Sequence, residues 1–276
     1  MIIGSFFNTG MLQLVGLEAN EIMKNAESIR SNLSLVKLSL LIMHLFSFLL
    51  PALLFGWMVF KSGMIDFYTL HKKIPVAGIG AAAILLLLSI PVIQYTYEWN
   101  QQLPLPEWMR SLEAEANETL ISLIRMDSLS EWIINILLIA ILPALGEELV
   151  FRGVIQQYGY RFFKNPHWSV WLSAVLFSAI HMQFEGFVPR FLLGLLLGYL
   201  FLWTKNLWYP IFVHFINNAL MVTLAFFIPE EELNLDALGP EEIPLYAVLG
   251  SVLLLYPAVR IFINNFETSE ADPSDS

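Results

Sequence analysis

The feature that most constrains this chain is the recurrence of apolar runs close to twenty residues long. About twenty residues of α-helix cross the roughly 30 Å hydrocarbon core of a bilayer, so such runs predict membrane spans. The composition agrees, because 57% of the residues are hydrophobic, 14% are charged, and the mean hydropathy is +0.65. We therefore predict an all-α, polytopic integral membrane protein with about seven transmembrane helices.

Seven segments have the composition of spans. They are about Leu38–Phe60, Ile74–Tyr95, Trp132–Lys164, Trp168–Met182, Phe187–Trp203, Leu207–Ile228 and Pro244–Ile263. The third contains 33 residues and would be roughly 50 Å long at about 1.5 Å per residue. Because this exceeds the thickness of a bilayer, we expect a tilt, or a break at Pro143 or Gly146.

The segments around the spans complete the predicted organisation. Residues 1–37 form an N-terminal interfacial segment, with a short helix over Met11–Met23 lying at the membrane surface. The remainder divides into the first two spans with an amphipathic surface helix (38–130), a core (131–228), an acidic loop with the last span (229–264) and a disordered acidic tail (265–276). Met1–Asn32 lacks a basic start and a small-residue cleavage site, so a removable signal peptide is not expected.

The charge distribution and the absence of cysteine exclude several function classes. The net charge of −10 is concentrated in Pro229–Glu242, with six acids, and in Glu267–Ser276, with four. These are solvated segments, so the acidity does not indicate nucleic-acid binding. A chain without cysteine has no disulfide, no thiolate metal ligand and no cysteine nucleophile.

Basic residues in the short loops predict the orientation. With seven spans, one side holds Lys61, Lys72, Lys73, Arg161, Lys164, Lys205 and Arg260. The other side's short loops hold only Arg190, so the positive-inside rule places the N-terminus outside and the C-terminus inside. Lys24, Arg30 and Lys37, before the first span, point the other way. We expect a bacterial-type cytoplasmic (inner) membrane.

The most unusual stretch is Gly146–Gly153, which follows the apolar run Trp132–Leu145 and contains Glu147, Glu148 and Arg152. Ionisable groups in such a setting face a cavity or each other and mark a functional site. Glu148 and Arg152 are four residues apart, which places them on one helix face as an acid–base pair. Glu147 points about 100° away and is the carboxylate available for chemistry. The alternative is a charge cluster at a helix end that reaches water.

Three more polar residues lie inside spans: His181, and the pair His214 and Asn218 one helical turn apart. Measured from the level of Lys164 and Lys205 at about 1.5 Å per residue, the depths are about 20–25 Å for His181, 25 Å for Glu147, 13 Å for His214 and 19 Å for Asn218. Each histidine alone is more often a packing residue, but a shared depth predicts one buried polar site.

These residue types suit hydrolysis by activated water. A carboxylate in a partly dry cavity is a better base near neutral pH, and a nearby histidine can polarise the water. A second histidine and a carboxamide one turn apart offer donors to a developing oxyanion. The sequence contains no His-Glu-x-x-His, Gly-x-Ser-Gly or Gly-x-Gly-Asp, so the usual signatures of zinc, serine and aspartyl hydrolases are absent. Hydrolysis of a peptide bond without a covalent intermediate fits best.

The motifs Glu147-Glu148-x-x-x-Arg152, Phe177-x-x-x-His181 and His214-x-x-x-Asn218, in this order on successive spans, resemble those of the CPBP family. This family comprises the CAAX prenyl endopeptidases and bacterial bacteriocin-processing relatives. The resemblance covers about Ile133–Phe227 and makes 131–228 a CPBP-like catalytic core. It implies that Glu147 with His181 activates the water, and that His214 with Asn218 stabilises the oxyanion. By the same resemblance, Glu148, Arg152 and Phe177 support the site.

Other readings of the same residues stay open. The family has also been described as metal-dependent, and two histidines with a glutamate could hold zinc. We favour a metal-free site without a cofactor, because the second histidine is paired with Asn218, a poor zinc ligand. A catalytically silent scaffold or a transporter could use the same cluster, although no internal repeat supports a transporter. The expected partners are the lipid bilayer and a peptide or membrane-protein substrate, prenylated or not, with no nucleic acid.

Overall fold

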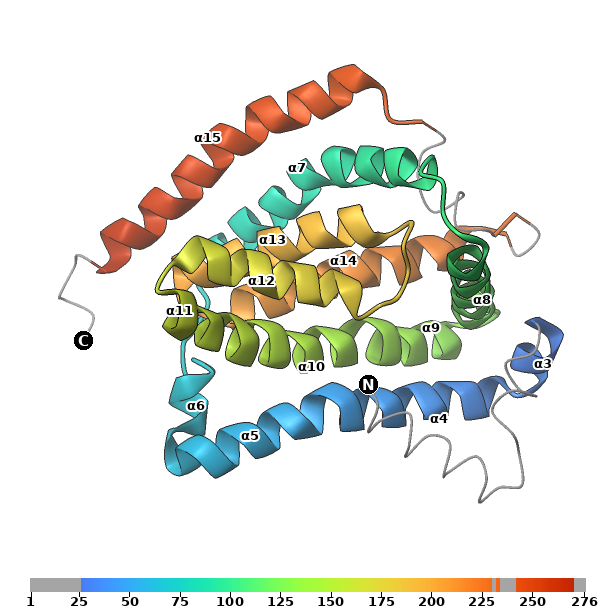
Figure 1. The fold of residues 1–276 in the computed structure, drawn as a ribbon, viewed down its shortest axis with the longest axis horizontal. Helices are drawn as coiled ribbons and strands as arrows, with labels where there is room; N and C mark the ends of the chain where they lie inside the picture. The colour runs from blue at the N-terminus through green and yellow to red at the C-terminus, as the bar shows by residue number, and fades with distance from the viewer. Residues whose placement is uncertain (1–25, 230–231, 234–241, 271–276) are drawn as a thin grey trace. The chain divides into compact units, whose positions relative to one another are not determined.

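The computed structural model describes residues 26–229, 232–233 and 242–270, and every regular element in these ranges is helical (Figure 1). Six helices in them are long and apolar enough to cross a membrane: Leu33–Phe67, Val76–Gln101, Leu129–Phe163, Phe187–Thr204, Trp208–Phe227 and Leu245–Asn265. The prediction of an all-α, multi-pass integral membrane protein is therefore confirmed.

The predicted count of seven spans is not confirmed. The predicted span Trp168–Met182 corresponds to helix α12 (Pro166–Ala179), which has 14 residues. At about 1.5 Å per residue it is about 21 Å long, shorter than the hydrocarbon core of a bilayer. The side chain of Asn165 caps its start by accepting from two backbone N–H groups, and the left-handed Met182 (φ 55°) lies in the turn that follows its end.

The chain forms two compact units, each assembled from three stretches of sequence. The first unit contains the described parts of 1–67, 105–150 and 214–240, and the second contains those of 68–104, 151–213 and 241–276. The polar motifs are divided between them, because one boundary follows Val150 and another precedes His214.

The first unit is built on two long helical runs that contact each other. One consists of α4 (Leu33–His44), the π-helical turn η1 (Leu45–Leu49) and α5 (Leu50–Phe60); the other consists of α9 (Leu129–Asn135), the π-helical turn η3 (Ile136–Ile141) and α10 (Leu142–Val150). Helix α8 (Glu107–Ile124) packs on α3 (Ala26–Ser31), and it is the amphipathic helix predicted within Gln101–Glu131. The short η2 (Lys61–Gly63) and α6 (Met64–Phe67) follow α5.

Both runs contain the tetrapeptide Leu-Pro-Ala-Leu directly after a π-helical turn, at 50–53 and at 142–145. A proline has no N–H to donate to the carbonyl four residues earlier, so the helix just before it is prone to local rearrangement. The predicted break at Pro143 or Gly146 is thus replaced by the π-helical turn η3, and the helix continues through both residues. Gly146 serves instead as a contact point, because a Cβ there would meet Phe48 Cβ at 3.1 Å and Leu49 N at 3.4 Å.

The second unit contains α7 (Val76–Gln101), the π-helical turn η4 (Phe151–Gln156), α11 (Gln157–Phe163), α12, α13 (Phe187–Thr204) and α15 (Leu245–Glu270). Helix α13 packs closely on α12, since a Cβ at Gly194 would meet Ala174 Cα at 3.1 Å and one at Gly198 would meet Val170 Cγ1 at 2.9 Å. Helix α14 (Trp208–Phe227) begins in this unit and continues into the first.

The predicted acidic tail needs a correction. Helix α15 extends to Glu270, beyond residue 265 where the disordered tail was expected to begin. Residues 265–272 contain no glycine or proline, so no strong helix breaker stands before Pro273. Residues 271–276, the predicted surface helix Met11–Met23 and most of the acidic loop Pro229–Glu242 lie outside the described residues.

Candidate functional site

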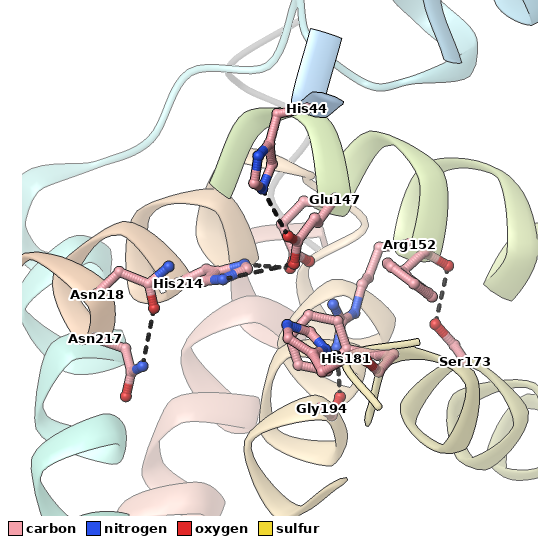
Figure 2. A network of polar contacts seen from close by, with 12 residues as sticks. His44, Glu147, Arg152, Ser173, His181, Gly194, His214, Asn217 and Asn218 are labelled. Atoms are coloured by element: carbon pink, nitrogen blue, oxygen red, sulfur yellow. Dashed lines mark hydrogen bonds and ion pairs between the residues drawn. The ribbon is translucent and has the colours of Figure 1, made fainter. Parts of the chain in front are cut away.

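Two buried carboxylates lie side by side on α10, inside an apolar helix. Glu147 is 5% exposed and Glu148 is not exposed at all. Burial of a carboxylate is costly unless polar groups face it, so the residues around these two define the candidate site. Figure 2 shows that histidines approach them from two other helices of the chain.

His214, on α14, lies between the two glutamates. Its Nδ1 is 2.8 Å from Glu148 Oε1, a hydrogen-bonding distance, and its Nε2 is 4.0 Å from Glu147 Oε2. A carboxylate that accepts from Nδ1–H fixes the orientation and tautomer of an imidazole. Glu148 therefore positions His214, and Nε2 is the nitrogen turned toward Glu147.

Asn218 lies one turn after His214, and its amide has a defined partner. Its Nδ2 donates to the carbonyl of Ile139 at 3.1 Å, and its Oδ1 accepts from Asn217 at 3.1 Å. Ile139 is four residues before Pro143. Its carbonyl therefore lacks the helical hydrogen bond that the missing N–H of Pro143 would have donated. Asn218 thus satisfies an acceptor that Pro143 leaves available. The amide carries a second N–H, which is the group that could serve chemistry.

His44 also faces Glu147, and the sequence did not predict this. Its Nε2 lies 3.6 Å from Glu147 Oε1, and its side chain is 16% exposed. The available signal was that His44 is the one titratable residue in the predicted span Leu38–Phe60. The span has no second ionisable residue at helical spacing, so a link to Glu147 depended on tertiary packing.

Arg152 is the centre of a separate group in the second unit. Its Nη2 donates to the carbonyl of Gly194 at 2.7 Å, and its guanidinium carbon lies 4.8 Å from the centre of the Phe177 ring. One turn later, Gln156 donates to the carbonyl of Gly198 at 2.9 Å. Two donors on η4 therefore hold two glycine carbonyls on α13, and both Arg152 and Phe177 are fully buried.

His181 lies two residues beyond the end of α12, within the same unit. Its Nδ1 donates to the Phe177 carbonyl at 2.8 Å, and its ring packs edge-on against the Phe177 ring at 5.3 Å. Because a carbonyl can only accept, Nδ1 carries the hydrogen and Nε2 is the ring nitrogen that does not take part in this bond. The spacing Phe177-x-x-x-His181 is explained by this bond, which needs residues four apart.

The structure therefore brings Glu147, Glu148, His214 and Asn218 together in one unit, and Arg152, Phe177 and His181 in the other. The predicted Glu148–Arg152 pair and the predicted sharing of one water by Glu147 and His181 stay predictions. Among the described residues, no group of three or more histidine, aspartate or glutamate side chains is arranged to hold a metal ion.

Comparison with known proteins identifies the segment that carries the motifs. Residues 129–220 match the family described as type II CAAX prenyl endopeptidase Rce1-like. The chain is 32% identical over 89 residues to the uncharacterized protein YpbD of Bacillus subtilis (strain 168), a match that covers 31% of this chain and 42% of that protein. It is 28% identical over 102 residues to the membrane-embedded CAAX protease MroQ of Staphylococcus aureus (strain USA300), covering 35% of this chain and 41% of MroQ.

The chain thus spans less than half the length of either relative. No solved structure matches it. The resemblance that the three motifs predicted is confirmed for residues 129–220, a segment that includes every predicted site residue. His44 lies outside it.

Proposed function

We propose that this chain is an intramembrane endopeptidase of the CAAX-protease type, which hydrolyses a peptide bond with activated water. The observation that carries the proposal is the placement of His214 between two buried carboxylates on one apolar helix. The match of this segment to a family of prenyl endopeptidases supports it. A scaffold would not need a histidine with one nitrogen fixed by Glu148 and the other turned toward Glu147.

In the proposed step, Glu147 acts as the general base. It takes a proton from a water as the water oxygen bonds to the carbonyl carbon of the substrate, and His181 helps to hold that water. When the carbon–nitrogen bond breaks, the proton passes from Glu147 to the leaving amine, so atoms and charges balance. The distances of 3.6 and 4.0 Å from Glu147 to the two histidines exceed those of direct hydrogen bonds and suit contacts bridged by an oxygen atom.

The oxyanion formed on the carbonyl oxygen would be stabilised by His214 and Asn218. His214 can donate from Nε2 only while it carries both ring protons, with Nδ1–H held by Glu148. Asn218 can donate through the N–H that is not bonded to Ile139. Both residues are held by another side chain or by a backbone carbonyl, so little reorganisation is needed during the reaction.

The substrate class that fits is a peptide or membrane protein whose scissile bond reaches the interior of the bilayer, prenylated or not. The decisive experiment compares the proteomes of membranes that carry the wild type and Glu147→Gln. One precursor should accumulate uncleaved in the variant. Identical processing in both membranes, with equal amounts of the two proteins, would refute the proposed function.

We also propose the cytoplasmic (inner) membrane of a bacterial-type cell, with the N-terminus outside and the C-terminus inside. Single cysteines at Asn165, Asn206 and Asp236 test the topology, because the chain has no cysteine of its own. Impermeant thiol reagents should label Asn165 and Asn206 from the inside and Asp236 from the outside if α12, α13 and α14 all cross. Labelling of Asn165 and Asp236 from the same face would mean that α12 does not cross and that the count is six.

A further inference from the structure

His44 stands out because it is an ionisable group inside an apolar span that the proposed mechanism does not use. It ends α4, and the π-helical turn η1 begins at the next residue. Ionisable residues inside membrane spans are costly and mark functional sites by default. Its position outside residues 129–220 means that the shared segment does not supply it.

The orientation of the ring is fixed from one side. His44 Nδ1 lies 3.2 Å from the carbonyl oxygen of Leu40, one turn earlier on the same helix. A carbonyl oxygen has no hydrogen to give, so Nδ1–H is the donor. His181 uses the same device, with its Nδ1 on the carbonyl of Phe177. In both residues the bond leaves Nε2 as the nitrogen that can interact elsewhere.

The Nε2 of His44 faces a carboxylate in a place with little water. It lies 3.6 Å from Glu147 Oε1, and the two side chains are 16% and 6% exposed. A neutral imidazole with Nδ1–H presents a lone pair at Nε2, which would repel an ionised carboxylate at this distance. A proton must therefore be placed between the two groups, on His44, on Glu147 or in a bridging water. Each arrangement restrains the same oxygen, Oε1.

Close packing of the two helices produces this contact. A Cβ at Gly146 would stand 3.1 Å from Phe48 Cβ and 3.4 Å from the backbone nitrogen of Leu49. A larger residue would meet η1 in tighter than usual contact, so glycine beside Glu147 favours the close approach of the first span. The ring of Phe48 also contacts the ring of His44, with centroids 5.7 Å apart.

We propose that His44 is a positioning residue for Glu147. It restrains Oε1 from the first span, so that the other oxygen, Oε2, stays toward His214 and the reacting water. This inference rests on the proposed function for its effect on catalysis, although the contact itself can be tested without a substrate. It implies that the first span is part of the reaction centre.

The contact is tested by nuclear magnetic resonance of purified protein labelled with 15N in its five histidines. The signal of His44 is assigned with His44→Phe, which keeps an aromatic ring against Phe48 and removes both nitrogens. We expect Glu147→Gln to shift the Nε2 signal of His44 and to leave that of His167, which is bonded to Tyr199, unchanged. An unchanged Nε2 signal of His44 in Glu147→Gln would overturn the contact.

The consequence for catalysis is tested with the precursor that accumulates in Glu147→Gln membranes. We expect His44→Phe to lower kcat by up to about 100-fold with KM nearly unchanged, because a small misplacement of a reacting group can cost that much. His44→Gln should recover part of that loss, because its amide can donate to Glu147. His167→Phe is the matched control and should keep wild-type kcat.

The outcomes separate this inference from the function on which it rests. Full activity of Glu147→Gln would refute the proposed function. An inactive Glu147→Gln together with wild-type kcat in His44→Phe would overturn only the role of His44. A loss in His44→Phe that is fully explained by a smaller folded fraction, with no recovery in His44→Gln, would likewise overturn it.

Discussion

The carboxylates of Glu147 and Glu148 and the guanidinium of Arg152 follow each other on one helical run, yet their surroundings differ in kind. Glu147 faces imidazole nitrogens at 3.6 and 4.0 Å, distances longer than those of direct hydrogen bonds. Arg152 donates to a carbonyl at 2.7 Å and lies against an aromatic ring. The proposed function assigns chemistry to Glu147 and support to Arg152, so the two roles would be separated by only a few residues.

The largest expected effect is that of Glu147→Gln, which keeps the shape of the side chain and removes the base. Cleavage of the accumulated precursor should fall by roughly 10²–10⁴-fold, the usual contribution of general-base catalysis. Abundance and thermal unfolding should stay near those of the wild type. Glu148→Gln should instead lower abundance, because a fully buried charge that holds His214 is lost. If Glu147→Gln lowered abundance and Glu148→Gln abolished only cleavage, the roles assigned to the two glutamates would be wrong.

Asn218→Ala is expected to lower kcat by about 10²–10³-fold, the cost of removing one oxyanion donor. The substitution also removes the bond to Ile139, so kcat must be measured per folded molecule. Asn217→Ala, which removes only a donor to the Asn218 oxygen, is the matched control and should have a smaller effect. Equal losses in both variants would assign Asn218 to the packing of α14 rather than to the reaction.

For Arg152 we expect a loss of stability and not of chemistry. Arg152→Met fills similar volume but leaves the carbonyl of Gly194 without this donor, which costs about 1–3 kcal/mol in a buried setting. Thermal unfolding in detergent should show a lower midpoint, with kcat per folded molecule retained. Gln156→Met removes the hydrogen bond from the neutral Gln156 amide to the Gly198 carbonyl, and it should lower the stability less than Arg152→Met does. A selective loss of kcat in Arg152→Met would break the distinction between the two clusters.

The smallest expected effect is that of metal removal, which should be none. Enzyme treated with a strong chelator should keep its activity and contain far less than one zinc per chain. Stoichiometric zinc, together with activity that chelation removes and added zinc restores, would contradict the metal-free mechanism. The site residues would stand in that case, with Glu147 and the histidines as ligands instead of base and donors.

Sequence patterns predicted what depends on local chemistry. The apolar runs located six helices that can cross a membrane, and the amphipathic pattern located α8. These sequence patterns could not show that α12 ends after 14 residues, because apolar residues continue beyond Ala179. The bond from Asn218 to Ile139 depends on Pro143 and on a helix far away in the chain.

The contact of His44 could not be predicted from the sequence for a related reason. Its own span contains no second ionisable residue, and its neighbour Glu147 is reached only through the packing of η1 at Gly146. The motif residues, in contrast, were recognisable from their spacing of one helical turn, which in the case of Phe177 and His181 is explained by a hydrogen bond between them.

The hydrogen bond between Glu148 and His214 has a consequence for biosynthesis, since the two residues are 66 positions apart. The ribosome delivers α10 to the membrane well before α14 exists, so Glu148 is inserted before the imidazole of His214 that will bond it. An unpartnered carboxylate is costly in hydrocarbon, which favours retention of α10 at the insertion machinery or in contact with water until α14 arrives. Under the proposed function, the reaction centre is therefore completed only when α14 enters the bilayer.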